Sequence, residues 1–192
     1  MTEKEKMLNG ENYNARDPEL LKMAQEARYY MDEFNKPGNH PDGDKTSILK
    51  NLCEFVGENV WIEKPFFCDY GKNISIGKNT FINFNCVFLD TNKIVIGENV
   101  LIAPSVQIYT ATHPLKASER INTNHKPHEA PYRTLTKPVT IGDNVWIGGN
   151  AIILPGVTIG NNSVIGAGSV VTKSIPENSL AMGNPCRVVK EV

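Results

Sequence analysis

Aliphatic residues recur at every sixth position through much of the chain after residue 70. The longest unbroken run is Ile141, Ile147, Ile153, Ile159, Ile165 and Val171, and shorter runs join Ile76 to Ile82 and Ile96 to Ile102 and Ile108. A period of six fits neither the 3.6-residue turn of an α-helix nor hairpins of ordinary strand length. It predicts a coil that turns a corner every six residues, with the aliphatic side chain inside and successive coils stacked at the spacing of β-strands.

Asparagine and glycine occupy fixed places in the same repeat. Asparagine stands three residues after the aliphatic position at Asn79, Asn85, Asn99, Asn144, Asn150 and Asn162. These two residue types accept the left-handed backbone conformation that a tight corner needs. Three corners per coil make a triangular prism, whereas a β-sandwich would have to produce the spacing by coincidence.

Residues 1–57 differ from the rest and predict a helical segment that packs on the repeat domain, residues 58–192. Asp17 is a suitable N-cap before Pro18, and the helix that begins there should stop at "NKPG". A second helix is expected from Asp44 to a stop at Gly57. Its buried side should carry Ile48, Leu52, Phe55 and Val56.

The count of six breaks off after Ile108, at "YTATHPLKAS", and resumes at Ile141. His113 stands where the break begins, and a long polar loop, residues 114–138, follows it. Histidine titrates near neutral pH, so it is a suitable general base. The alternative is a metal site made of His113, His125 and His128, although the last two belong to the irregular loop.

The composition gives no indication of some classes of partner, although a local basic patch is compatible with it. The 20 basic and 21 acidic residues nearly balance, which gives no reason to expect nucleic acid or an anionic membrane as a partner. The N-terminus lacks the apolar core of a signal peptide, and no apolar run is long enough to span a bilayer. We therefore expect a cytoplasmic protein whose cysteines, Cys53, Cys68, Cys86 and Cys186, are free thiols.

The hexads "IGDNVW", "IGGNAI", "ILPGVT", "IGNNSV" and "IGAGSV" resemble the hexapeptide-repeat acyltransferases, whose fold is a left-handed parallel β-helix. More narrowly, "EKEKMLNGENYNARDPEL", "CDYGKNISIG", "TATHP", "KPVTIGDNVWIGG", "LPGVTIG" and "GNPCRVVK" are similar to the maltose and galactoside O-acetyltransferases. The resemblance implies transfer of an acetyl group from acetyl-CoA, a cosubstrate, to a sugar hydroxyl. It also implies a homotrimer with active sites between subunits.

The resemblance further assigns site residues. His113 matches the general base of the family. Sugar contacts are expected at Asp17, Asp69, Asn83 and Asp90, but "DTNK" departs from the paired acids of the galactoside enzyme, so the acceptor stays open. Coenzyme A is expected to contact Trp146, Gly149, Ala167, Thr172, Lys173, Arg187 and Lys190, where small residues admit the pantetheine arm and cations suit the phosphates.

Other functions remain open. The acceptor could be an antibiotic hydroxyl or an amino sugar. The same prism also serves metal-dependent enzymes related to the γ-carbonic anhydrases, and a non-catalytic scaffold or sugar-binding module is a third class.

Overall fold

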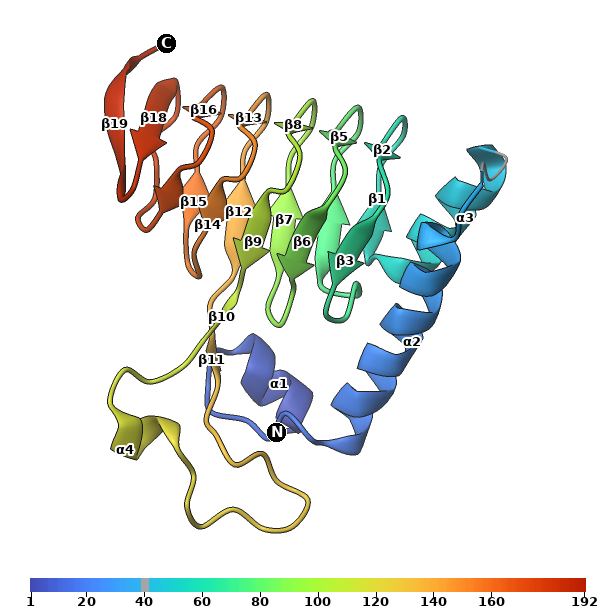
Figure 1. Ribbon diagram of the computed structural model, residues 1–192, viewed down its shortest axis with the longest axis vertical. Coiled ribbons are helices and arrows are strands. Elements are labelled where there is room, and N and C mark those ends of the chain that lie inside the picture. Colours follow the sequence, from blue (N-terminus) through green and yellow to red (C-terminus); the bar gives the residue numbers. More distant parts are fainter. Residues whose placement is uncertain (39–41) are drawn as a thin grey trace.

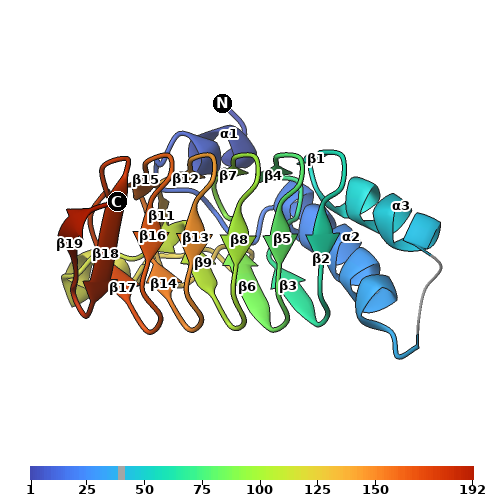
Figure 2. The ribbon, with the colours of Figure 1, turned by 90° about the horizontal axis from the view of Figure 1, so that it is seen from above.

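The computed structural model describes residues 1–38 and 42–192, and there the repeat forms a parallel β-solenoid with three sheets as walls (Figures 1 and 2). Sheet A contains β1 (Phe55–Val56), β4 (Ile74–Ile76), β7 (Ile94–Ile96), β12 (Val139–Ile141) and β15 (Thr158–Ile159). Sheet B contains β2 (Trp61–Ile62), β5 (Phe81–Ile82), β8 (Leu101–Ile102), β13 (Trp146–Ile147), β16 (Val164–Ile165), β18 (Ser179–Gly183) and β19 (Cys186–Glu191). Sheet C contains β3 (Phe66–Cys68), β6 (Cys86–Leu89), β9 (Gln107–Tyr109), β14 (Ile152–Ile153) and β17 (Val170–Val171). The solenoid expected from the six-residue period is confirmed.

The inward aliphatic positions form continuous columns. In sheet A, for example, Ile76 pairs with Ile96, Ile96 with Ile141 and Ile141 with Ile159. All of these side chains are buried. Each coil thus buries its aliphatic residues against the coils on either side, which gives the prism its core.

The corners have the predicted backbone. All six asparagines named above have a positive φ, between 55° and 61°. Side-chain amides also join corners of successive coils, because Asn79 donates to Asn99, Asn99 to Asn144, and Asn144 to Asn162, at 2.9 to 3.2 Å. Four of them therefore both turn the chain and connect the coils along the edge between sheets A and B: Asn79, Asn99, Asn144 and Asn162.

The other two edges need names because they carry the functional residues. Strands of sheet C are parallel, so they all begin at one edge and end at the other. We call the edge from sheet B to sheet C, at residues 83–85, 103–106, 148–151 and 166–169, the glycine edge. The edge from sheet C toward sheet A, at residues 69–73, 90–93, 110–113 and 172–174, is the histidine edge.

Three helices precede the repeat. Helix α1 (Glu3–Leu8) begins at a capping box of Thr2 and Glu5, and α2 (Pro18–Asn35) begins at its N-cap Asp17, as predicted. Helix α3 (Asp42–Leu52) is shorter than predicted, because Phe55 and Val56 form β1, which pairs with β4. The prediction that Phe55 is buried is wrong, since it is 57% exposed on the outer face of the sheet.

The chain leaves the prism after Thr110. Strand β10 (Ala111–Thr112) pairs antiparallel with β11 (Leu135–Thr136), and α4 (Ala117–Arg120) lies in the loop between them (Figure 1). The chain returns where Lys137 N–H donates to the Thr110 carbonyl at 2.8 Å. The polar loop is therefore the outer part of an excursion on a two-stranded stem.

The two ends of the prism are covered differently. Helices α2 and α3 lie beside the first coil, and the β18–β19 hairpin closes the far end (Figure 2). Among the described residues, none of the helices is both long and apolar enough to cross a membrane.

Candidate active site

His113 directly follows β10, at the histidine edge. Its Nδ1 lies 2.7 Å from the carbonyl oxygen of Arg133, across the stem of the excursion. A carbonyl oxygen only accepts hydrogen bonds, so Nδ1 carries the proton and Nε2 keeps a lone pair. The ring also makes an edge contact with Tyr132, at 5.7 Å between ring centroids. The exposed imidazole is thus oriented by two residues of the segment that precedes β11.

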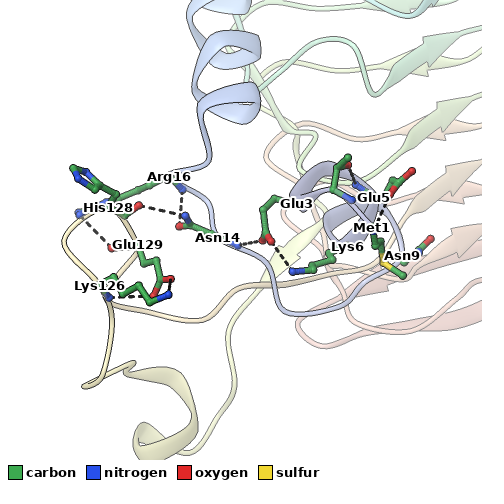
Figure 3. Close-up of polar contacts among 11 residues, drawn as sticks. Met1, Glu3, Glu5, Lys6, Asn9, Asn14, Arg16, Lys126, His128 and Glu129 are labelled. Carbon is green, nitrogen blue, oxygen red and sulfur yellow. Dashed lines mark hydrogen bonds and ion pairs between the residues drawn. The ribbon is translucent and has the colours of Figure 1, made fainter.

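The N-terminal segment holds the excursion in place (Figure 3). Asn14 donates from Nδ2 to the carbonyl of His128 at 3.2 Å and accepts from Ala130 N–H at 3.1 Å. The backbone N–H of Asn14 in turn donates to Glu3 of α1 at 2.5 Å. The loop that carries the partners of His113 is therefore tied to the first helix.

Asp69 and Thr91 meet on the coils that precede His113. The Thr91 hydroxyl donates to Asp69 Oδ2 at 3.0 Å. Burial raises the pKa of the Asp69 carboxyl, whereas the hydrogen bond from Thr91 and the charge of Arg28 lower it. Asp69 is half-buried and lies at the same edge as His113, as the resemblance requires of an acceptor contact.

Asp90 does not fit the expectation of a sugar contact. It is 0% exposed, and its carboxylate accepts backbone N–H groups from Asp69 and Tyr70, both at 2.9 Å, and from Asn73 at 3.2 Å. The Asp90 side chain thus connects the turn at residues 90–93 to the turn at residues 69–73. In this conformation the Asp90 carboxylate is not accessible to a sugar, and the predicted contact stays a prediction.

Two other predicted acceptor contacts lie elsewhere. Asp17 accepts Glu19 N–H at 2.9 Å, so the structure gives it the role of a helix cap. Asn83 lies between β5 and β6, at the glycine edge, where its Oδ1 accepts Phe84 N–H at 2.8 Å. Within one chain, Asn83 and His113 stand at opposite edges of sheet C, so the predicted contact of Asn83 with the acceptor stays a prediction.

The small residues expected to border coenzyme A do come together. Gly168 N–H donates to the Gly149 carbonyl at 2.8 Å, which places Ala167 on the coil next to Gly149. At Gly148 a Cβ would lie 2.5 Å from Ala167 N, so coil stacking alone requires that glycine. Trp146 is 54% exposed on the outer face of sheet B, a short step before this edge.

The remaining predicted cofactor contacts divide between two places. Thr172 and Lys173 are exposed at the histidine edge, directly after β17. Arg187 and Lys190 are exposed on β19, opposite Met182 and Leu180 of β18. The predicted site residues of one chain therefore form two groups on two edges.

No group of three or more His, Cys, Asp or Glu side chains among residues 1–38 and 42–192 is arranged to hold a metal ion. His125 Nδ1 lies 3.1 Å from the carbonyl of Lys126, within the loop. All four cysteines are free and buried.

Several residues of the site had no expectation attached to them. Arg133 acts through its backbone carbonyl, so no side-chain pattern identifies it. Tyr132 and Thr91 are ordinary loop and corner residues in the sequence. Their roles appear only when the stem and the corner place them beside His113 and Asp69.

The fold and these two edges define a hexapeptide-repeat transferase. Residues 138–173 match the model of the bacterial transferase hexapeptide (six repeats), and residues 6–57 match the maltose acetyltransferase hexapeptide capping motif. Among relatives, the galactoside O-acetyltransferase of Escherichia coli is 46% identical over 164 residues, which is 84% of this chain and 75% of that protein.

Solved structures agree in sequence and shape. A maltose O-acetyltransferase from Clostridium difficile 630 is 48% identical, with a TM-score of 0.92 over 100% of this chain and 98% of the other. An acetyltransferase from Vibrio cholerae complexed with acetyl coenzyme A is 38% identical, with a TM-score of 0.88 over 100% and 98% of the two chains. The chain belongs to the maltose and galactoside O-acetyltransferase family, and it is an acetyltransferase.

Proposed function

We propose that this enzyme transfers the acetyl group of acetyl-CoA directly to a hydroxyl of a sugar of the maltose, glucose or galactoside type, in the cytoplasm. The observation that carries the proposal is the orientation of His113, whose Nδ1 is bonded to the Arg133 carbonyl while Nε2 keeps its lone pair. Membership of the acetyltransferase family supports the reaction, and the orientation of His113 supports its proposed role as general base.

In the proposed reaction His113 Nε2 accepts the proton of the acceptor hydroxyl while its oxygen attacks the thioester carbon. The carbon–sulfur bond then breaks, and the imidazolium returns the proton to the leaving thiolate of coenzyme A. The Arg133 carbonyl stabilises the imidazolium through Nδ1–H and keeps the ring in one orientation. No covalent enzyme intermediate is required.

Acceptor recognition falls to Asp69 in this proposal. Its carboxylate stays half-buried at the histidine edge, where a hydroxyl-rich ligand provides several donors. The hydrogen bond from Thr91 leaves the other carboxylate oxygen for such a ligand. Asp90 is left out of the proposed contacts because both of its carboxylate oxygens already accept backbone N–H groups. Asp17 caps α2 through one oxygen, and its contact with the acceptor stays a prediction.

The glycine edge suits the pantetheine arm of acetyl-CoA. Gly149 and Ala167 lie on neighbouring coils and present little bulk, so the backbone there is accessible to an extended ligand. Charge expected near the phosphates comes from Arg187 and Lys190 on β19. A further charge and a hydroxyl come from Lys173 and Thr172 at the histidine edge.

These two edges meet only if two copies of the chain pack together, so we propose a homotrimer. The histidine edge of one copy would face the glycine edge of the next, which brings Asn83 of a second copy to the acceptor. Three such contacts close a ring in which every site uses two subunits.

An apolar stripe on the outer face of sheet B supports this packing. Trp61, Phe81, Leu101, Trp146 and Val164 stand in register on successive coils. Leu101 and Trp146 are each more than half exposed. A continuous apolar stripe of this kind is typical of a contact surface, and it borders the glycine edge.

The test is a panel of acceptors, with release of coenzyme A as the readout and mass spectrometry of the product. Glucose, maltose and a galactoside are compared with an amino sugar and an antibiotic alcohol. The proposal predicts a sugar O-acetate as the main product. If only the amino sugar or the antibiotic alcohol is acetylated, the acceptor is not the proposed one. If none of the acceptors is acetylated, the proposal is contradicted.

A further inference from the structure

The buried turn at residues 90–92 connects the acceptor contact to the base. On one side, Asp90 accepts the backbone N–H groups of Asp69 and Tyr70. On the other side, Asn92 N–H donates to Thr110 Oγ1 at 2.8 Å, and that hydroxyl donates to the Leu89 carbonyl at 2.7 Å. Thr110 stands three residues before His113 in the chain.

The same turn also reaches the N-terminal helix and the stem. Asn92 Nδ2 donates to Thr136 Oγ1 of β11 at 2.8 Å and to the Leu8 carbonyl at 3.0 Å. Thr136 in turn donates to the Met7 carbonyl. The turn is thus bonded to Thr110, which precedes β10, to Thr136 of β11 and to the end of α1.

The turn after β3 has little freedom of its own. Gly71 has a φ of +68°, and a Cβ there would lie 2.5 Å from the Leu52 carbonyl at the end of α3. Asn73 Nδ2 donates back to the Asp90 carbonyl at 2.7 Å. Asp90 therefore joins the turn at residues 69–73 to the next coil from both directions.

We infer that Asp90 is a positioning residue, which fixes the distance between Asp69 and His113 and so sets the affinity for the sugar acceptor. The inference rests on the proposed function. Its physical basis is that a fully buried carboxylate with three backbone donors holds those donors firmly, since each would otherwise be left unpaired.

Asp90→Asn tests the inference, because it keeps the size of the side chain but turns an N–H₂ group toward backbone donors. We expect the KM for the sugar acceptor to rise on the order of tenfold. The KM for acetyl-CoA and the slow hydrolysis of acetyl-CoA without acceptor should stay within about twofold, because neither uses Asp69. A purely structural defect would lower all activities together.

Asp143→Asn is the matched control. Asp143 also accepts a backbone N–H, from Glu98 at 2.8 Å, but it is at the edge between sheets A and B. It should leave the acceptor KM unchanged.

Thr91→Val is a second test variant in case Asp90→Asn does not fold. It removes only the hydrogen bond from Thr91 to Asp69 Oδ2. We expect a smaller rise in the acceptor KM. An unchanged acceptor KM in the folded variants, or equal losses with both substrates, would overturn the inference. Absence of sugar acetylation by the unmodified protein would instead contradict the proposed function.

Discussion

At the scale of single residues, the hydrogen bond and the ring contact of His113 fix the direction in which its imidazole points. His113 has its Nδ1 committed to the Arg133 carbonyl and its ring beside Tyr132. The stretch "TATHP" leads to this histidine, but nothing in it reveals the carbonyl that orients the ring. That partner lies 20 residues further along, shortly before β11 of the stem.

His113→Ala should lower kcat by a factor on the order of 10² to 10⁴, because the attacking hydroxyl loses its proton acceptor. Binding of acetyl-CoA, measured by calorimetry, should change little. His125→Ala is the control, since the Nδ1 of that side chain is bonded to the Lys126 carbonyl of its own loop. Nearly full turnover by the His113→Ala enzyme would show that His113 is not the general base.

Asp90 also makes a prediction about stability. Burial raises the pKa of its carboxyl from the ordinary 3.8 to about 6, although the backbone N–H groups of Tyr70 and Gly71 act in the opposite direction. The folded protein therefore binds this proton more tightly than the unfolded chain. The stability that protonation contributes is fully present below the unfolded pKa, and it is lost as the pH rises through about 6.

The size of this effect follows from the shift of about two pKa units, which corresponds to about 3 kcal/mol. The free energy of unfolding of the natural protein, relative to Asp90→Asn, should fall by up to that amount between pH 4 and pH 6.5. Denaturant titrations at a series of pH values measure the difference. Parallel pH profiles for the two proteins would show that Asp90 has an ordinary pKa.

At the scale of elements, the six-residue period predicted nearly all the coils. It succeeds because each coil repeats one requirement, an inward aliphatic residue and a corner with a positive φ. It fails at the start of the solenoid, where Phe55 and Val56 continue an apolar pattern that also suits a helix. Phe55 and Val56 form a strand because they pair with β4. The periodicity of one segment cannot predict a pairing with another segment.

Asn144 offers a test of the corners. Asn144→Ala should lower the free energy of unfolding by about 1–2 kcal/mol, because alanine is strained at a φ of 58°. Asn144→Gly should cost less, since it relieves the strain and loses only the amide bonds to Asn99 and Asn162. Thermal unfolding at equal protein concentration measures both. Equal losses would assign the role of Asn144 to its side-chain bonds.

At the scale of the whole molecule, the sequence names candidate residues but does not show that the fold divides them between two edges. His113, Asp69, Thr172 and Lys173 stand at the end of sheet C, whereas Asn83, Gly149 and Ala167 stand at its beginning. Position in the repeat fixes this division, because all strands of the sheet run in one direction. The left-handed sense of the coil remains a prediction of the resemblance.

The central claim is that one acetyl-transfer site uses His113 of one copy and the glycine edge of another. Mixing subunits of two inactive variants tests it most directly: His113→Ala, and Ala167→Trp, which places a bulky ring on an exposed position of the glycine edge. Each variant alone should be inactive. When the two variants are co-expressed in equal amounts, about a quarter of the sites should be active. Those sites combine the intact histidine edge of an Ala167→Trp copy with the intact glycine edge of a His113→Ala copy. Mixed oligomers that remain inactive would contradict the claim, since they would show that each site lies within a single chain.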